Sequence, residues 1–458
     1  MASGLLLWLG FAPVQNWVAP FIGIAILFRI LLDKSVRERF LFSFIAGLSF
    51  FLPLLHWSSV YVGSIPWLVL AVGESAIFSL IALFSWTRKW ESALSFSLMF
   101  TLMEIVRMKF PFGGFGWGRV GFTQVDSFSA LYPFFGVTGI SLLVASASFS
   151  VLSLRVSSVF LIFALSISFL FDNSGNSKAD ETIQITAIQG GVDDLGLDFN
   201  SRALRVLQRH AQATHNVPGS DLYIWPENAS DVDPLKNSQA KKLIKDVVSR
   251  IQAPLLIGAV EESDQGPINS SLLFNTEAEI VSRYIKQDLA PFGEYMPVRK
   301  LAEAISPYAK RVNDFLPGSS WVKHSVIGVP FQSLICFEVL DDDHSKKGAE
   351  GAAFLVAQTN NATFGKSYEA AQQLQITRAR AAESERNIAV VSTTGFTAHI
   401  DSSGKILSKA EQIAAQSLTM NLALENPAKI TWAQRTSSGV WAIGLMLGFV
   451  ACRVRSRR

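Results

Sequence analysis

Cysteine and charge are both scarce in this sequence. The two cysteines, Cys336 and Cys452, lie far apart in very different surroundings, which argues against a fold held together by disulfides. There is no Cys-x-x-Cys motif and no Cys/His cluster with metal-ligand spacing, so we expect neither a metal site nor a cofactor. The acidic run 341–344 is better explained as a loop or the start of a helix than as metal ligands.

The low share of charge also bears on the partners of the chain. Only 17% of the 458 residues are charged, 49% are hydrophobic, and the formal net charge is +3. Neither this small charge nor any stripe of lysine and arginine supports a nucleic-acid partner. Most of the apolar excess lies before residue 172, and another apolar run follows residue 436. The sequence therefore predicts a membrane protein with a soluble domain between two membrane parts.

Long apolar runs predict about eight membrane spans, since a spanning helix needs roughly 17–25 apolar residues. We expect a transmembrane domain of about seven spans over residues 1–172 and a C-terminal transmembrane helix over residues 437–453. The runs in the first part are 3–14, 16–32, 39–58, 66–86, 91–108, 127–153 and 157–172.

Basic residues between the runs predict the orientation. With eight spans, the loops that carry them all lie on one side, and by the positive-inside rule that side is the cytoplasm. The soluble part, residues 173–436, would then lie on the extracytoplasmic face. The basic residues are Lys34, Arg37, Arg39, Arg88, Lys89, Arg155 and the arginines after the last span.

The loop after the fifth run breaks this rule, because it carries Arg107, Lys109 and Arg119. It also contains a stretch rich in glycine and aromatic residues that includes Trp117. One interpretation is that Trp117 and Arg119 contact a lipid head group. The other is a re-entrant turn anchored by an interfacial tryptophan.

Two carboxylates, Glu74 and Glu104, lie inside the apolar runs, where charge is costly and is often functional. Arg107 follows Glu104 by one helical turn, so we expect these two side chains to pair. Glu74 has no local partner in the sequence and is a candidate functional residue.

Residues 181–425 have a different pattern, in which short β-rich runs alternate with amphipathic helices. This pattern indicates an α/β domain with a buried mixed sheet. The expected strands are 183–188, 222–225, 255–260, 271–274, 280–285, 326–336 (one strand or a strand pair), 353–358 and 388–393, the last followed by a hairpin. The expected helices are 199–213, 236–251, 343–350 and 367–385.

Three chemically useful residues come where expected strands end. Glu227 follows a Trp-Pro pair, Lys286 follows the strand 280–285, and Cys336 ends a long apolar run. Each has an ordinary structural explanation, as a turn residue, an exposed strand-end charge and a buried thiol. Together they predict one pocket that holds a carboxylate, an ammonium and a thiol nucleophile.

The residues around these three carry a family resemblance. The motifs Trp-Pro-Glu, Lys-x-x-Leu-x-Pro-Phe-Gly-Glu and Ile-Cys-x-Glu, in this order, resemble the carbon–nitrogen hydrolase (nitrilase) superfamily. With the spans before and after them, the whole chain resembles the apolipoprotein N-acyltransferase family. Further matching segments are 117–124, 136–139, 189–190, 293–297, 359–365, 373–383 and 394–395.

The resemblance implies an αββα sandwich on an eight-helix domain in the bacterial cytoplasmic membrane, with the sandwich on the extracytoplasmic face. It also implies a reaction without cofactor: transfer of an acyl chain from a phospholipid to the N-terminal diacylglyceryl-cysteine of an apolipoprotein. We expect ping-pong kinetics through a thioester, and a monomer.

The resemblance further assigns roles to residues. Cys336 would be the nucleophile, Glu227 the general base, and Lys286, with the backbone N–H of Phe337, the oxyanion donor. The supporting carboxylates are expected to be Glu294 and Glu338. Candidates for the substrate contacts and lids are Phe292, Tyr295, Phe364, Trp117 and Arg119.

Two departures from the family pattern concern substrate preference. Phe337 stands where many members have tyrosine, and Thr363 stands where tryptophan is common. Two other functions are compatible with the residues: a membrane-tethered amidase that hydrolyses a small amide, and a non-enzymatic membrane binding or transport protein.

Overall fold

The computed structural model describes residues 1–151, 181–192, 195–197, 203–215, 217 and 219–457. It divides into two compact units. The membrane unit comprises residues 1–176, 340–343 and 431–458, and the catalytic unit comprises residues 177–339 and 344–430. The segment 340–343, which shortly follows Cys336, therefore belongs with the membrane helices by its contacts.

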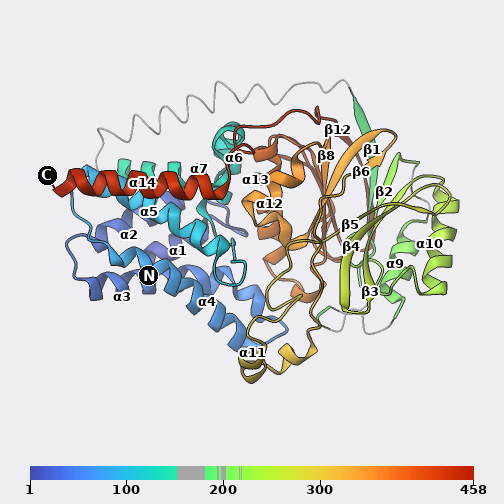
Figure 1. Ribbon diagram of the computed structural model, residues 1–458, viewed down its shortest axis with the longest axis horizontal. Coiled ribbons are helices and arrows are strands. Elements are labelled where there is room, and N and C mark those ends of the chain that lie inside the picture. Colours follow the sequence, from blue (N-terminus) through green and yellow to red (C-terminus); the bar gives the residue numbers. More distant parts are fainter. Residues whose placement is uncertain (152–180, 193–194, 198–202, 216, 218, 458) are drawn as a thin grey trace. The chain divides into compact units, whose positions relative to one another are not determined.

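The membrane unit is helical (Figure 1). Local sequence explains where some of its helices begin: Ser35 and Glu38 form a capping box at the start of the third helix, and Pro20 occupies the first turn of the second. The helices are α1 (Ala2–Leu9), α2 (Ala19–Leu31), α3 (Val36–Leu54), α4 (Ser64–Phe78), α5 (Trp90–Lys109), α6 (Val125–Phe128), α7 (Tyr132–Ala147) and α14 (Ser438–Arg457), with short 3-10 turns between several of them.

Three helical stretches in the described residues are long and apolar enough to cross a membrane. They are Ser64–Leu83, Val120–Ala147 and Ser438–Arg455. The helix Ala19–Leu31 is apolar but shorter, and the expected span 157–172 lies outside the described residues. The number of eight spans therefore stays a prediction, as does their orientation.

The catalytic unit contains two six-stranded sheets, rather than the one mixed sheet indicated by the sequence pattern alone. The first sheet has the order β12-β1-β2-β3-β4-β5 and the second β11-β10-β9-β8-β7-β6. The strands are β1 (Thr182–Gln189), β2 (Leu222–Ile224), β3 (Leu255–Ser263), β4 (Gly266–Phe274), β5 (Ile280–Ile285), β6 (His324–Val326), β7 (Val329–Ile335), β8 (Phe354–Thr359), β9 (Ile388–Ser392), β10 (Ala398–Ile400), β11 (Ile406–Lys409) and β12 (Gln416–Ala423).

Helices cover the outer faces of the two sheets, which gives the αββα sandwich that the family resemblance implies (Figure 1). α9 (Arg205–Ala213) and α10 (Ser238–Ile251) pack on the first sheet, and α12 (Asp342–Ala349) and α13 (Glu369–Ser384) cover the second. A short helix, α11 (Arg299–Ile305), lies in the long connection between β5 and β6. The expected helix 199–213 begins only at Arg205 among the described residues.

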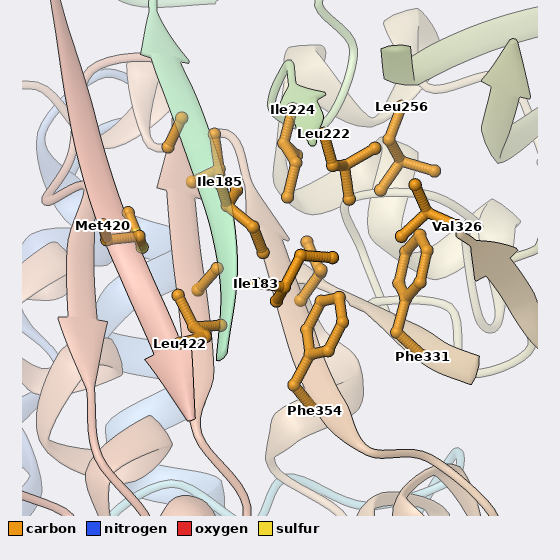
Figure 2. Packing of buried hydrophobic residues seen from close by; sticks show 14 of the residues in the cluster. Ile183, Ile185, Leu222, Ile224, Leu256, Val326, Phe331, Phe354, Met420 and Leu422 are labelled. Atoms are coloured by element: carbon orange, nitrogen blue, oxygen red, sulfur yellow. The ribbon is translucent and has the colours of Figure 1, made fainter. Parts of the chain in front are cut away.

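The core of the sandwich lies between the sheets (Figure 2). Alternate residues of each strand face it: in β2, Leu222 and Ile224 point into this core while Tyr223 packs under the outer helices. From the second sheet, Phe331 and Phe354 stack with ring centroids 4.9 Å apart. The alternation of apolar side chains thus fixes the register of both sheets.

The direction of the strands brings several loops to one edge. β1, β2 and β3 run parallel in the first sheet, and β7, β8 and β9 run parallel in the second. β5 has the same direction as β3, because both pair antiparallel with β4. The expected run 326–336 is a hairpin: Ile327 and Gly328, both with positive φ, join β6 to β7.

The stacked pair between the sheets tests this core. Phe354→Ala should lower the stability of the catalytic unit by roughly 3–5 kcal/mol, because a fully buried ring leaves a cavity. In detergent, the melting temperature should fall by about 6–20 °C. The control is Leu407→Ala on the exposed face of β11, which should change it little. Equal melting temperatures for both variants would contradict the assignment of the core.

Candidate active site

Three strand ends supply the central groups of the site. Glu227 follows β2 after Trp225 and Pro226, and Pro226 ends the strand because it has no N–H for the ladder. Lys286 directly follows β5, and Cys336 directly follows β7. The strand ends predicted from the sequence therefore agree with the observed ones to within one residue.

The ammonium of Lys286 is almost fully buried between two carboxylates. Its Nζ lies 3.2 Å from Glu227 Oε1 and 2.8 Å from the carboxylate of Glu294. Burial alone would lower the pKa of Lys286, but these two carboxylates outweigh it and hold the pKa well above its ordinary value. Lys286 therefore stays a cation, and it can stabilise a negative charge that develops beside it.

Asn269 of β4 joins the two carboxylates from the other side. Its Nδ2 donates to Glu227 Oε1 at 2.8 Å and to Glu294 Oε1 at 2.9 Å. The backbone N–H of Ala290 donates to Glu294 Oε2 at 2.8 Å. Burial raises the pKa of Glu227, although Lys286 opposes this effect. Glu227 is thus a stronger base than a solvent-exposed carboxylate, and its orientation is fixed.

Cys336 has a backbone conformation that non-glycine residues seldom adopt, with φ of +51°. This bend ends β7 and starts a short 3-10 turn, 336–339. Burial raises the pKa of the Cys336 thiol well above its usual value, and the charge of Glu227 adds to the increase while Lys286 opposes it. The resting thiol is therefore protonated, and it needs a base to become a nucleophile.

Glu338, two residues after Cys336, holds two strand ends together. Its carboxylate accepts from the backbone N–H of Ile335 at 2.7 Å and from that of Gln287 at 2.8 Å. Tyr284 donates its hydroxyl at 2.9 Å. Although burial opposes ionisation, His344 and these donors hold the pKa of Glu338 below its usual range. The carboxylate thus connects the residue before Cys336 to the residue after Lys286.

Of the three lid candidates of the catalytic unit, Phe292 and Tyr295 lie in the connection between β5 and α11, and Phe364 ends the short 3-10 helix Ala362–Phe364. Phe292 is 49% exposed in a tight turn in which its N–H donates to the carbonyl of Tyr295 at 2.8 Å. Tyr295 and Phe364 are half-buried.

Trp117 and Arg119, the two candidates in the membrane unit, are buried rather than open to a head group. The ring of Trp117 stacks on Phe115 with centroids 6.0 Å apart. Arg119 is 0% exposed, and its guanidinium binds Asp342, with Nη1 2.5 Å from Oδ1 and Nη2 3.0 Å from Oδ2. A lipid head group needs an exposed cation, and the guanidinium of Arg119 is buried. Trp117 is buried as well, so the structure does not favour the head-group interpretation.

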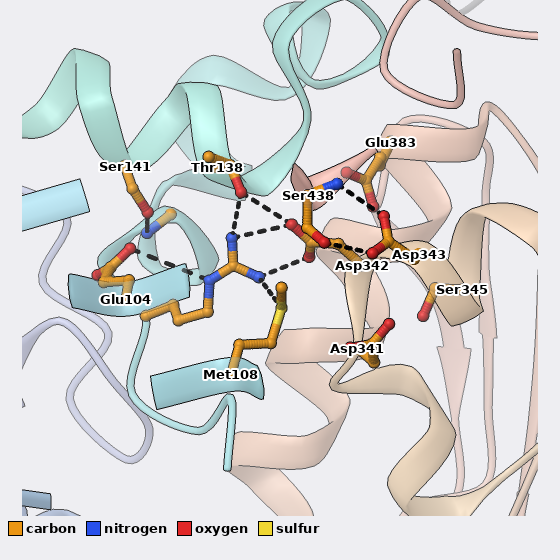
Figure 3. A network of polar contacts seen from close by, with 12 residues as sticks. Glu104, Met108, Thr138, Ser141, Asp341, Asp342, Asp343, Ser345, Glu383 and Ser438 are labelled. Atoms are coloured by element: carbon orange, nitrogen blue, oxygen red, sulfur yellow. Dashed lines mark hydrogen bonds and ion pairs between the residues drawn. The ribbon is translucent and has the colours of Figure 1, made fainter. Parts of the chain in front are cut away.

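The contacts of Arg119 belong to a larger polar network in the membrane unit (Figure 3). Thr138 donates to Asp342 Oδ2 at 2.8 Å and accepts from Arg119 Nη2 at 2.7 Å. Lys109 lies 2.5 Å from Asp341 and 3.1 Å from Asp343. The acidic run after Cys336 is therefore neutralised by cations of the membrane unit, and no group of potential metal ligands is found in the described residues.

The expected pairing of Glu104 with Arg107 is wrong. Arg107 Nε binds Glu74, which is 33 residues away on α4, and Arg107 Nη2 donates to the carbonyl of Trp117 at 2.6 Å. Glu104 instead accepts from the backbone N–H of Val120 at 2.7 Å. Sequence spacing suggested that Arg107 pairs with a residue of its own helix, but the packing of the helices places a carboxylate of α4 against it. Glu74 thus has a structural partner.

Sequence reasoning did not identify several residues around the site. Asn269 lies in a polar interruption of the β4 run, which was a usable signal. Tyr284 and His344 reach Glu338 only because β5 and the start of α12 meet there, and spacing gives no sign of it. Ser271 and Gln358 connect the two sheets at 2.7 Å, and Gln358 Nε2 donates to the carbonyl of Trp225 at 2.7 Å.

Comparison with known proteins identifies the family. Residues 3–150 match the family model of the apolipoprotein N-acyltransferase N-terminal domain, and residues 184–428 match that of carbon–nitrogen hydrolases. An apolipoprotein N-acyltransferase of Mycolicibacterium smegmatis is 32% identical over 460 residues, which cover 90% of this chain and 77% of the relative. The chain belongs to the apolipoprotein N-acyltransferase family.

A second relative is less similar to this chain. The apolipoprotein N-acyltransferase of Geobacter metallireducens is 26% identical over 442 residues, covering 88% of this chain and 85% of the relative. Among solved structures, an amidase of the nitrilase superfamily from Nesterenkonia is 16% identical, with a TM-score of 0.42, and covers 56% of this chain and 95% of its own. The match to the carbon–nitrogen hydrolase family establishes the nitrilase-like fold of the catalytic unit.

The raised pKa of Cys336 is testable by alkylation. In a Cys452→Ser background, the rate with iodoacetamide should still be rising at pH 10, because the thiolate fraction grows until the pH passes the raised pKa. A peptide thiol, with its pKa of about 8.5, should level off in the same range and serves as the control. A plateau below pH 8 for Cys336 would show a lowered pKa instead.

The Arg119–Asp342 pair is also testable. Asp342→Ala should destabilise the protein by roughly 3–5 kcal/mol, because it removes the carboxylate that neutralises a fully buried guanidinium. The double variant Arg119→Met/Asp342→Leu should recover most of the loss in a thermal unfolding measurement. Glu350→Ala, which breaks the exposed Lys347 pair, should cost less than about 1 kcal/mol. A double variant no more stable than Asp342→Ala would contradict the pairing.

Proposed function

We propose that this chain N-acylates apolipoproteins, taking the acyl chain from a phospholipid and holding it as a thioester on Cys336. The observation that carries the proposal is the grouping of a thiol, a buried ammonium and a buried carboxylate at three strand ends. Membership of the apolipoprotein N-acyltransferase family supports an acyltransferase that acts on apolipoproteins.

In the first half-reaction, Glu227 takes the thiol proton and the sulfur of Cys336 attacks the ester carbonyl of the phospholipid. Lys286 and the backbone N–H of Phe337 stabilise the oxyanion of the tetrahedral intermediate, and each such donor contributes about 3 kcal/mol in comparable sites. The C–O bond of the ester then breaks. The lysophospholipid leaves as an alcohol with the proton from Glu227, and the acyl chain stays on the sulfur.

In the second half-reaction, the α-amino group of the diacylglyceryl-cysteine attacks the thioester carbonyl. Glu227 accepts the amine proton, and Lys286 again faces the oxyanion. The C–S bond breaks, the amide forms, and the thiol recovers its proton from Glu227. Glu294 supports the reaction by holding the ammonium of Lys286 in place. Glu338 supports it by holding together the two strand ends that carry Lys286 and Cys336.

The acyl-enzyme must be kept from water between the two steps, since hydrolysis would release a free fatty acid. Phe292, Tyr295 and Phe364 are the residues we assign to this task. The exposed apolar ring of Phe292 supports the assignment, because it would gain contact with a lipid chain.

We assign the protein to the bacterial cytoplasmic membrane, as a monomer with eight spans and the catalytic unit on the extracytoplasmic face. Support comes from the three long apolar helices and from the basic loops, which the positive-inside rule assigns to the cytoplasm. The relatives are bacterial, which agrees with this location.

Intact mass spectrometry tests the proposal. Detergent-purified protein incubated with a phospholipid should gain the mass of one acyl chain, and neutral hydroxylamine should remove it, because it cleaves thioesters. Cys336→Ser should gain no hydroxylamine-labile mass.

The second cysteine provides a matched control. Cys452→Ser should form the adduct as the wild type does, since this residue lies in the last helix, α14, which belongs to the membrane unit. A hydroxylamine-labile adduct that persists in Cys336→Ser, or a wild type that stays unmodified with every phospholipid supplied, would contradict the proposed function.

A further inference from the structure

A second polar cluster lies behind the sulfur of Cys336, at the start of α13. Glu369 and Gln373 are one helical turn apart and therefore share a face of this helix. Both side chains are buried, with 2% and 4% exposure. Gln373 Nε2 lies 3.7 Å from Cys336 Sγ, within hydrogen-bond distance for sulfur. The mechanism described above uses neither residue.

Asn361, which follows β8, determines how this cluster is oriented. Its Oδ1 accepts from the hydroxyls of Ser392 at 2.6 Å and Thr359 at 3.1 Å. The Ser392 hydroxyl itself accepts from the N–H of Gly395 at 2.8 Å, so its hydrogen is directed to Asn361. The oxygen of the Asn361 amide is thereby identified, and its nitrogen must lie on the other side.

That nitrogen makes two donations. Asn361 Nδ2 donates to Glu369 Oε2 at 2.6 Å and to Gln373 Oε1 at 2.9 Å. Since Gln373 Oε1 is used as an acceptor, the NH₂ group of Gln373 is the part that faces Cys336. An amide N–H can only donate to the sulfur, and a thiolate is a better acceptor than a neutral thiol.

We propose that Gln373 donates a hydrogen bond that stabilises the thiolate of Cys336, and that Glu369 is a positioning residue that holds Gln373 in this orientation through Asn361. The inference rests on the proposed function. It adds a hydrogen-bond donor next to the sulfur of Cys336. Among the described residues, Lys286 is the only cation near this sulfur, and it also compensates the carboxylates of Glu227 and Glu294.

The charge of Glu369 matters for the same reason. The charge of Glu227 affects the pKa of Glu369, and the charge of Glu369 in turn affects the pKa of Cys336. Lys286 and Glu294 are the other charged groups that affect the pKa of Cys336. Burial raises the pKa of Glu369 to about 8, and the charge of Glu227 adds to the increase. Below this pH Glu369 is mostly neutral. Above it, the new carboxylate opposes formation of a thiolate at Cys336.

Two variants test the proposal by single-turnover acylation from phospholipid. Gln373→Met keeps a similar volume and removes the donor. The acylation rate should fall roughly 10- to 100-fold, the usual value of one hydrogen bond to a charged group, at an unchanged melting temperature. Thr377→Val, one turn further along α13, removes a hydroxyl that donates to the carbonyl of Gln373, and it should stay within about twofold of the wild type.

Glu369→Gln separates the charge of Glu369 from its positioning contact, because glutamine can still accept from Asn361 but cannot ionise. The ratio of its acylation rate to that of the wild type should be close to one at pH 6.5 and should rise at least about threefold by pH 9.5. It also keeps the proposal testable if Gln373→Met fails to fold.

The inference is overturned if folded Gln373→Met acylates within twofold of the wild type, or if the rate of Glu369→Gln relative to wild type does not change with pH. Failure of the proposed function would differ from both results, since the wild type itself would then form no thioester.

Discussion

The buried ammonium of Lys286 is the interaction on which the catalytic site depends. An unpaired cation would be very costly there, and Glu227 and Glu294 compensate it at 3.2 Å and 2.8 Å. Transfer of a proton from Cys336 to Glu227 leaves the net charge of the site unchanged. It moves one negative charge from the carboxylate to the sulfur, and Lys286 is near both. A protonated resting thiol is therefore compatible with a nucleophilic one during catalysis.

The same constraint explains the surrounding hydrogen bonds. Because one cation serves several acids, each carboxylate also needs neutral donors: Asn269 bridges Glu227 and Glu294, and backbone N–H groups bind Glu338. These donors come from strands and strand ends, whose positions the core between the two sheets fixes. The sandwich thus sets the geometry of the site, while Phe292 lies exposed in the connection between β5 and α11.

The amino-acid sequence was sufficient to predict the residues whose signal is local. Glu227, Lys286 and Cys336 each follow an apolar run directly, so strand ends and chain order located them. The sequence pattern alone indicated one mixed sheet; the family resemblance was needed for the sandwich, because apolar alternation does not tell which strands pair. The polar interruption of β4 was a local signal for Asn269, but its partners and those of the Asn361 cluster come from separate strands and helices, and no spacing rule predicts them.

In the membrane unit, local spacing was misleading. The i, i+3 relation suggested that Glu104 pairs with Arg107, whereas Arg107 pairs with Glu74 of another helix. Arg119 was a head-group candidate because its loop breaks the positive-inside rule, yet it is buried against Asp342. Both arginines are thus paired with carboxylates from distant segments of the chain, and only the packing of the helices reveals these partners.

The central claim is that one sulfur passes an acyl chain from lipid to amine, and transfer from the isolated acyl-enzyme measures this most directly. Acylated protein, freed of phospholipid, is mixed with a synthetic peptide that carries an N-terminal diacylglyceryl-cysteine, and the peptide mass is followed. The account predicts that one acyl chain per enzyme moves to the α-amino group in a single turnover. An unchanged peptide, with the chain released as free fatty acid, would contradict it and identify a hydrolase.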